Sequence, residues 1–249
     1  MAESGFRLMI APRAMAKTRF SSPTPLSNNC MSVEEGMVLL THHMETSESP
    51  ASMVVIDGPG DPLATPEITI EAISQIRKKF PKLLIGVATL GIGCQQFAPA
   101  LAKAGLNILE MEVNATRPEI LEKLYAWIRP TQKTMKISES VSLLVSEQRN
   151  GLPALRFHEI NVRIRTTLYP GYNLNHIEKI SREMMELGAS GITLVSYKPQ
   201  RDAEVHLETV TEQQVGTAGG NASKYLPVVP GICDNFVADK TPSEKLFPS

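Results

Sequence analysis

A loop rich in glycine and proline, GPGDP at 58–62, is the segment of this chain best suited to hold a small ligand. Gly58 and Gly60 let the backbone come close to a ligand, and free N–H and C=O groups in such a loop can bind a zwitterion such as an amino acid. Asp61 and Pro62 complete the loop. The alternative is a plain turn between a strand and a helix, because proline and glycine clusters also end such elements.

Further polar residues follow apolar segments, and each has a structural alternative. Thr89, in the loop ATLGIG, could donate a hydrogen bond from its hydroxyl group to a carboxylate, or it could cap the next helix. Asn114 could bind a ligand through its amide or cap the helix that follows it. In YPGYN at 169–173, Asn173 is most simply interpreted as a cap after a turn.

Metal-ligating and catalytic side chains do not gather at a recognisable spacing. Cys30, Cys94 and Cys233 are odd in number and far apart, which excludes a disulfide scaffold. The histidines lack partners at ligand spacing, so no mononuclear metal site is expected. No general base or nucleophile stands out near the loops described above. The sequence therefore predicts no metal ligand and no catalytic residue.

Charged residues alternate on two of the expected strands. Glu110 and Glu112 alternate on one, and Arg163 and Arg165 alternate on the next. If these faces line a barrel, the arginines could hold an anionic ligand. Otherwise the two sets neutralise each other as buried pairs.

Composition limits the classes of partner. The 249 residues are 42% hydrophobic and 20% charged, which is enough for a packed core. Lys and Arg total 25 against 26 for Asp and Glu, a net charge of −1, so a footprint for nucleic acid or anionic lipid is not expected. No apolar run reaches about 18 residues and no secretory signal opens the chain. We expect a cytoplasmic protein that binds neither nucleic acid nor membrane.

Apolar runs alternate regularly with helical patterns. Strands are predicted at 7–11, 52–56, 83–88, 106–113, 161–168 and 191–197. Helices are predicted at 32–43, 66–80, up to 104, 118–128, 138–149 and before 188. The first of these helices opens with a capping box, Ser32 and Glu35. Beyond Pro199 the pattern fades into a tail.

This alternation predicts an α/β fold. Strands too uniformly apolar for a one-sided sheet indicate parallel strands inside and helices outside, as in a partial (β/α)6 barrel. Residues 1–200 would form the barrel and 201–249 a C-terminal tail. In such folds ligands bind in the loops after the carboxyl ends of the strands, which is where the polar loops above lie.

Several segments, in order, resemble the NifB family. They are VIDGPGDPLATPE, FPKLLIGVATLG, MEVNA, KLYAWIR and VRIRTTLYPGYN, within a similarity from about Phe6 to Asp239. NifB proteins are radical S-adenosylmethionine (SAM) proteins that build the precursor of the nitrogenase iron–molybdenum cofactor. The resemblance implies a partial barrel of the radical SAM type.

The resemblance also implies where SAM would lie. The residues around it would be Gly58, Gly60, Asp61, Pro62, Thr89, Asn114 and Tyr197. The first four would meet its methionine end, with backbone groups pairing its amino group. Thr89 would lie near its carboxylate or ribose, Asn114 near the ribose, and Tyr197 near the adenine. One departure is Leu90, which replaces the asparagine of the family's ATNG and removes a polar contact.

The larger departure concerns the family's [4Fe–4S] cluster, held by CxxxCxxC in the loop after the first strand. At the matching positions this chain has Ala14, Thr18 and Ser21, with the spacing intact. Alanine has no donor atom, and neutral hydroxyls are poor iron ligands beside a thiolate. The family also has a later segment, CxxCRADA. At the matching positions this chain keeps the first cysteine, as Cys233, and has Phe236 in place of the second. We therefore expect the cluster to be absent.

These observations predict a NifB-like protein without radical chemistry. It would be an accessory, regulatory or partner protein in metallocofactor assembly, acting with an intact NifB-type protein and still able to bind SAM. Because no cluster supplies an electron, the prediction leans against an enzyme. The alternatives are a SAM-dependent enzyme without radical chemistry, a pure binding module, and an active radical SAM protein with an unrecognised cluster site.

Overall fold

Six parallel strands form one curved sheet, in the order β1-β3-β4-β5-β7-β8. The computed structural model describes residues 5–21, 30–130, 135–200, 202–203 and 205–234. The strands are β1 (Gly5–Met9), β3 (Met53–Asp57), β4 (Leu84–Thr89), β5 (Ile108–Glu112), β7 (Asn161–Leu168) and β8 (Gly191–Ser196). Each neighbouring pair is parallel. The α/β class and all six predicted strands are confirmed.

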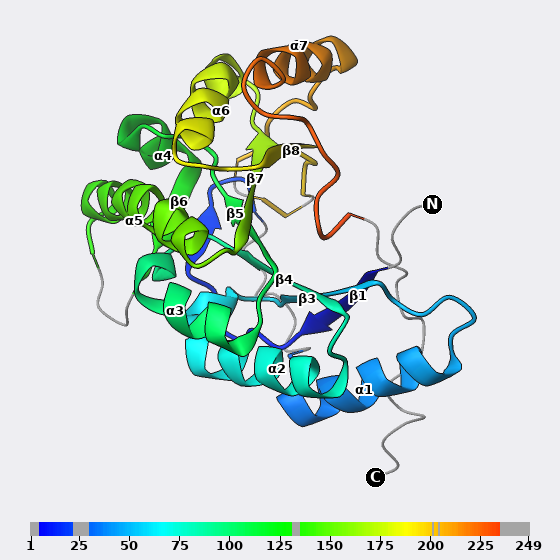
Figure 1. Ribbon diagram of the computed structural model, residues 1–249. Helices are drawn as coiled ribbons and strands as arrows, with labels where there is room; N and C mark the ends of the chain where they lie inside the picture. The colour runs from blue at the N-terminus through cyan, green and yellow to red at the C-terminus, as the bar shows by residue number, and fades with distance from the viewer. Residues whose placement is uncertain (1–4, 22–29, 131–134, 201, 204, 235–249) are drawn as a thin grey trace.

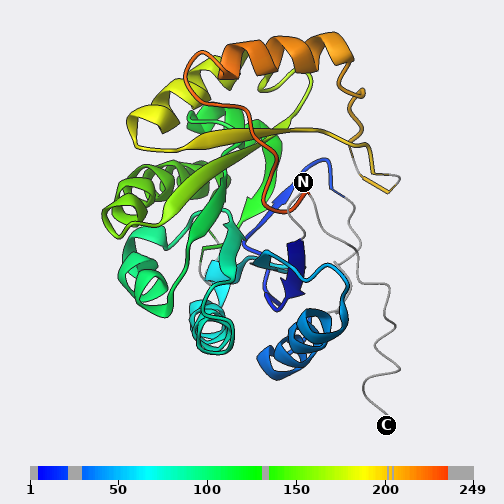
Figure 2. The same ribbon diagram turned by 45° about the vertical axis from the view of Figure 1, so that its right-hand side comes forward.

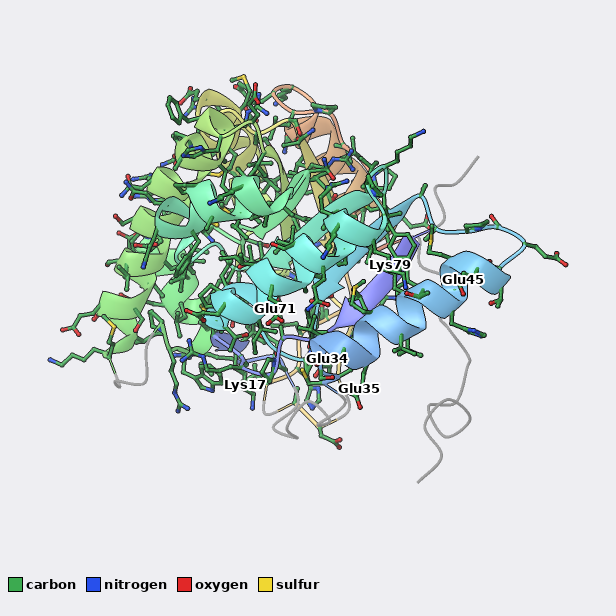
Figure 3. The ribbon with its side chains drawn as sticks, turned by 60° about the horizontal axis from the view of Figure 1, so that its bottom comes forward. Lys17, Glu34, Glu35, Glu45, Glu71 and Lys79 are labelled. Carbon is green, nitrogen blue, oxygen red and sulfur yellow. The ribbon has the colours of Figure 1, made fainter. Side chains whose placement is uncertain are left out.

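Helices cover the outer side of this sheet, as Figure 1 shows. They are α1 (Val33–Thr46), α2 (Pro66–Lys79), α3 (Cys94–Ala104), α4 (Pro118–Leu124), α5 (Ile137–Phe157), α6 (Ile177–Glu186) and α7 (Glu212–Ala222), with short 3₁₀ turns η1 (Pro62–Ala64) and η2 (Leu174–His176). The predicted capping box of Ser32 and Glu35 opens α1. Figure 3 shows α1 beside α2, where the Lys79 Nζ donates to the Thr41 Oγ1 at 2.7 Å.

The main core lies between the sheet and the helices. Alternate strand residues such as Leu8, Val54 and Leu109 point outward and are at most 1% exposed. The inner face is different: a small apolar cluster of Met53, Val55, Ile108 and Ile232 lies there, followed by charged residues toward the strands' carboxyl ends. Two buried faces explain why the strand sequences show little alternation of apolar and polar residues. Within the described residues, no helix has both the length and the apolar character needed to cross a bilayer.

The prediction of one helix over 118–128 is wrong. The helix α4 ends at Leu124, and β6 (Tyr125–Ile128) pairs antiparallel with β2 (Ala16–Thr18). Tyr125 and Ile128 are each 2% exposed, so burial and the β2 partner override the continuing helical pattern. The two strands hold the loop after β1 against the end of α4.

The predicted helix end near Arg149 is also wrong, because α5 continues to Phe157 through Gly151 and Pro153. At Gly151 a side-chain Cβ would lie 2.6 Å from the Cβ of Cys94 in α3. The glycine therefore serves the close packing of α5 on α3 rather than ending the helix. Packing of this kind offsets the low helix propensity of glycine.

The chain beyond Pro199 contains more structure than the predicted tail. Thr211 and Gln214 form a capping box that opens α7, and Val228 then pairs with Ile192 of β8. Figure 2 shows the segment after α7 crossing the inner side of the sheet toward β1. Ile232 ends this path inside the sheet, against Val55 and Ile108. The domain boundary proposed at residue 200 stays a prediction.

Candidate functional site

A cavity of about 990 Å³ lies at the carboxyl ends of the parallel strands. Asp57 of β3, Thr89 of β4, Glu112 of β5 and Thr167 of β7 line it from those ends. This is the place where the strand pattern predicts a ligand site. The loop after β1 closes another side of the cavity, with Ala14, Met15, Ala16, Lys17, Thr18 and Ser21 in its lining.

The GPGDP loop lies against the segment at 11–13 rather than standing free. The Gly60 N–H donates to the Ala11 carbonyl and the Asp61 N–H to the Arg13 carbonyl, both at 2.8 Å. A Cβ on Gly60 would lie 2.3 Å from the Arg13 carbonyl carbon, and one on Gly58 would lie 2.5 Å from the Ala11 oxygen. The close approach that the glycines predict is therefore made to the chain itself. Of this loop's predicted site residues, only Gly60 and Asp61 line the cavity.

The Asp61 carboxylate joins the loop after β3 to the loop after β4. Its Oδ1 accepts from the Leu63 N–H and the Thr89 hydroxyl at 2.8 Å each, and its Oδ2 accepts from the Leu90 N–H at 2.6 Å. Burial raises the pKa of Asp61 to about 6, against the effect of these donors. Thr89 does not cap α3, whose N-cap is Gly93. The side chains of Asp61 and Thr89 both face the cavity, but the hydrogen bonds given above join them to other groups of the protein.

Asn114 links three elements beneath the cavity. Its Nδ2 donates to the Glu112 Oε1 at 2.6 Å and to the Tyr125 hydroxyl at 3.1 Å, and its Oδ1 accepts from the Thr167 N–H at 2.9 Å. It is 1% exposed and lies outside the cavity lining. The capping alternative is wrong, because the N-cap of α4 is Arg117.

Asn173 also makes tertiary contacts instead of capping the turn that follows it. Its Nδ2 donates to the Asn114 and Thr167 carbonyls, and its Oδ1 accepts from the Tyr169 N–H. Its side chain caps neither η2 nor α6. Asn173 thus occupies the N-cap position of η2 without a capping hydrogen bond from its side chain, which instead holds the YPGYN turn to the loop after β5 and the end of β7.

Tyr197 belongs to an aromatic cluster beside the cavity. Its ring centroid lies 5.7 Å from that of Tyr169 and 6.0 Å from that of Phe20, which also packs on Tyr172 at 5.1 Å. Tyr197 is 6% exposed and lies outside the lining. Its hydroxyl has no hydrogen-bond partner among the residues that the structure describes. Phe20, 1% exposed, holds the loop after β1 in this cluster.

Ala14, Thr18 and Ser21, the residues that the resemblance to the NifB family matches with the cluster cysteines, all face the cavity. The Thr18 Oγ1 lies 2.6 Å from the Ser21 Oγ, so the two hydroxyls bond to each other. These side chains do not fit a [4Fe–4S] cluster, which proteins hold through cysteine thiolates. Within the described part of the chain, no group of three His, Cys, Asp or Glu residues could hold a metal ion.

The remaining cysteines do not make up for these positions. Cys233 lines the cavity with its Sγ 3.9 Å from the Asp57 Oδ2, and burial raises the pKa of its thiol to about 12. Cys94 is fully buried in α3, the structural role that its position predicts. The residues at 235–239, which complete the CxxCRADA comparison, lie outside the described residues.

Charge pairs occupy the inner face of the sheet. The Arg165 Nη1 lies 3.4 Å from the Glu110 Oε2 and 3.1 Å from the Asp234 Oδ1, which confirms the paired reading for Arg165. Burial raises the pKa of Glu110, and the guanidinium of Arg165 opposes that rise. A second pair, missed from the sequence, joins the Arg7 Nε to the Asp57 Oδ2 at 2.9 Å. Arg7 and Asp57 are 50 positions apart in the chain, so no local spacing indicates this second pair.

Comparison with known proteins identifies the relatives of this chain. No family model matches it. The FeMo cofactor biosynthesis protein NifB of Chlorobaculum tepidum is 28% identical over 205 residues, which are 81% of this chain and 48% of that protein. The NifB of Methanocaldococcus infernus is 28% identical over 230 residues, 88% of this chain and 75% of that protein. The chain is a relative of the NifB proteins.

The chain thus spans about half the length of the Chlorobaculum NifB. Among solved structures, SuiB of Streptococcus suis bound to S-adenosylmethionine matches with a TM-score of 0.69 and 12% identity, over 92% of this chain and 51% of that one. The radical S-adenosylmethionine methyltransferase TsrM of Kitasatospora setae matches with a TM-score of 0.55 and 12% identity, over 78% and 36%. At this identity the likeness concerns the fold, and it confirms the radical SAM type of partial barrel.

Proposed function

We propose that this NifB relative works in metallocofactor assembly without a [4Fe–4S] cluster. It would act in the cytoplasm as an accessory or regulatory protein for an intact NifB-type partner, and its cavity would bind SAM. The observation that carries this proposal is the hydrogen bond between Thr18 and Ser21, beside Ala14, at the three positions where the family has cysteines.

The loop at 12–21 also has its own means of support. The strand β2 pairs with β6, and Phe20 is buried among tyrosine rings. A loop held by hydrogen bonds and aromatic packing needs no metal to fix its conformation. Reductive cleavage of SAM needs an electron from a cluster, so we infer that radical chemistry is not the role of this protein.

The cavity suits a ligand of the size and chemistry of SAM. Its volume of about 990 Å³ is at the upper end for small-molecule sites. Gly60, Asp61 and Thr89 line one part of it, and aromatic residues line another, including Trp127 and Tyr169. Bound SAM would supply a methyl group or serve as a regulatory signal, while these residues would orient it and exclude water.

Iron content tests the cluster half of this proposal. After anaerobic reconstitution with iron and sulfide, the natural protein should stay colourless and free of stoichiometric iron. The triple variant Ala14→Cys, Thr18→Cys and Ser21→Cys should take up about four irons per chain, as a cubane requires. A double variant, Ala14→Cys and Thr18→Cys, is the matched control and should hold markedly less. A stable cluster in the natural protein would overturn the proposal.

Binding assays test the other half. Calorimetric titration with SAM should give a saturable signal with one site per chain. The absence of both heat and thermal shift would remove SAM from the proposal. Co-purification with an intact NifB-type protein tests the partner, and repeating it with SAM separates a regulated complex from a permanent one.

A further inference from the structure

Four acidic residues line the cavity, and Glu112 and Asp61 are the two that form no ion pair within the described residues. Asp61 accepts three hydrogen bonds from the Leu63 and Leu90 N–H groups and the Thr89 hydroxyl, which take the place of a counter-ion. Asp57 has Arg7 as its counter-ion, and Glu110 has Arg165. The Glu112 carboxylate accepts a hydrogen bond from Asn114 at 2.6 Å and forms no ion pair with any residue that the structure describes. Lys17 lines the same cavity, yet no ion pair joins it to Glu112.

The surroundings of Glu112 make its lone negative charge costly. Burial raises the pKa of Glu112 and outweighs the hydrogen bonds from Asn114 and Tyr125 and the charge of Arg165, which lower it. The charge of Asp57 raises this pKa further, and Arg165 itself is paired with Glu110 and Asp234. Glu112 in turn raises the pKa of Asp61, so the carboxylates after β3 and β5 repel each other. A buried charge of this kind is stabilised when an opposite charge comes within contact distance.

Aromatic side chains add a second feature that favours a cation. Tyr125, Trp127 and Tyr169 line the same cavity as Glu112. The faces of such rings attract cations, and more strongly where water is excluded. Among the described residues, Arg129 stacks on one of these rings, with its guanidinium 4.6 Å from the Trp127 ring centroid.

We propose that Glu112 is the subsite for a positively charged group of the bound ligand. This inference rests on the proposed function, because a cluster-free site changes the charge of a SAM-type ligand. An amino group that binds iron does so through its lone pair and is neutral, whereas a free α-amino group is mostly protonated at pH 7. The ligand then carries an ammonium as well as a sulfonium, and Glu112 supplies the counter-ion for one of them.

Three nucleoside probes distinguish the two cations. SAM carries a sulfonium and an ammonium, S-adenosylhomocysteine carries the ammonium alone, and methylthioadenosine carries neither. Each is titrated into the natural protein and into Glu112→Gln. Glutamine keeps an oxygen that can accept from Asn114, so the variant should fold, which thermal melting checks. The control is Glu119→Gln, which removes an exposed carboxylate that is 73% accessible.

The expected result is a loss of at least about 10-fold in SAM affinity on Glu112→Gln, because a hydrogen-bonded charge contributes more to binding than a neutral amide. If only SAM loses affinity, Glu112 contacts the sulfonium. If SAM and S-adenosylhomocysteine lose affinity equally, Glu112 contacts the ammonium. Methylthioadenosine and the control variant should show no change. Equal effects on all three probes, or none, would overturn the subsite while leaving SAM binding intact. No binding of any probe to the natural protein would reject the subsite together with the SAM half of the proposed function.

Discussion

Replacing Phe20 by alanine should destabilise the protein strongly, because this ring holds the loop that carries Ala14, Thr18 and Ser21. Phe20 is 1% exposed, and its ring centroid lies within 6.0 Å of those of Tyr169, Tyr172 and Tyr197. Truncating a buried phenylalanine costs about 3–5 kcal/mol. Phe20→Leu keeps most of the apolar volume and loses the ring contacts, so we expect about 1–2 kcal/mol.

Equilibrium unfolding in urea, followed by tryptophan fluorescence, measures both values. Trp127 is the single tryptophan of the chain and lies in β6, whose partner β2 belongs to the same loop as Phe20. Phe157→Ala is the control: Phe157 is 83% exposed, so its loss should change the free energy of unfolding by less than about 0.5 kcal/mol. A cost below about 1 kcal/mol for Phe20→Ala, or an equal cost for the control, would show that aromatic packing does not hold this loop.

Three further substitutions test other parts of the site. Glu112→Gln should raise the melting temperature at pH 8 and much less at pH 5. Because the pKa of Glu112 is raised in the folded protein, its ionisation costs stability as the pH rises, and glutamine has no such cost. A constant difference in melting temperature between the two proteins from pH 5 to 8 would contradict this. Asp61→Ala should cost about 3–5 kcal/mol in urea unfolding, since it leaves the buried N–H groups of Leu63 and Leu90 without their acceptor; a cost near zero would mean that water replaces the carboxylate. Gly60→Ala should lower the free energy of unfolding by about 2–3 kcal/mol, because its Cβ would overlap the Arg13 backbone. The control Gly216→Ala, with open space around it in α7, should instead raise that free energy by about 0.5–1 kcal/mol. Equal effects of the two substitutions would refute the close approach at Gly60.

The order of the six parallel strands, and the edge of the sheet where the cavity lies, follow from the sequence alone. Apolar runs separated by helical patterns specify parallel strands and outer helices, because this arrangement buries both faces of each strand. The capping box of Ser32 and Glu35 fixed the start of α1 through contacts between residues three apart. Thr211 and Gln214 carry the same local pattern, and α7 was missed because the glycines that follow lower its helix propensity.

The contacts that the polar residues of the site make depend on the tertiary structure. Asp61, Thr89 and Asn114 were all predicted near a ligand, yet each also bonds to a residue brought close by the fold. The strand at Tyr125–Ile128 exists because β2 supplies its partner, and α5 continues past Gly151 because α3 packs there. Glu112 could be singled out only after the structure had shown the ion pairs of Asp57 and Glu110 and the hydrogen-bond donors of Asp61. Sequence spacing reports contacts within an element, whereas charge pairing and helix packing join residues that the chain separates by tens of positions.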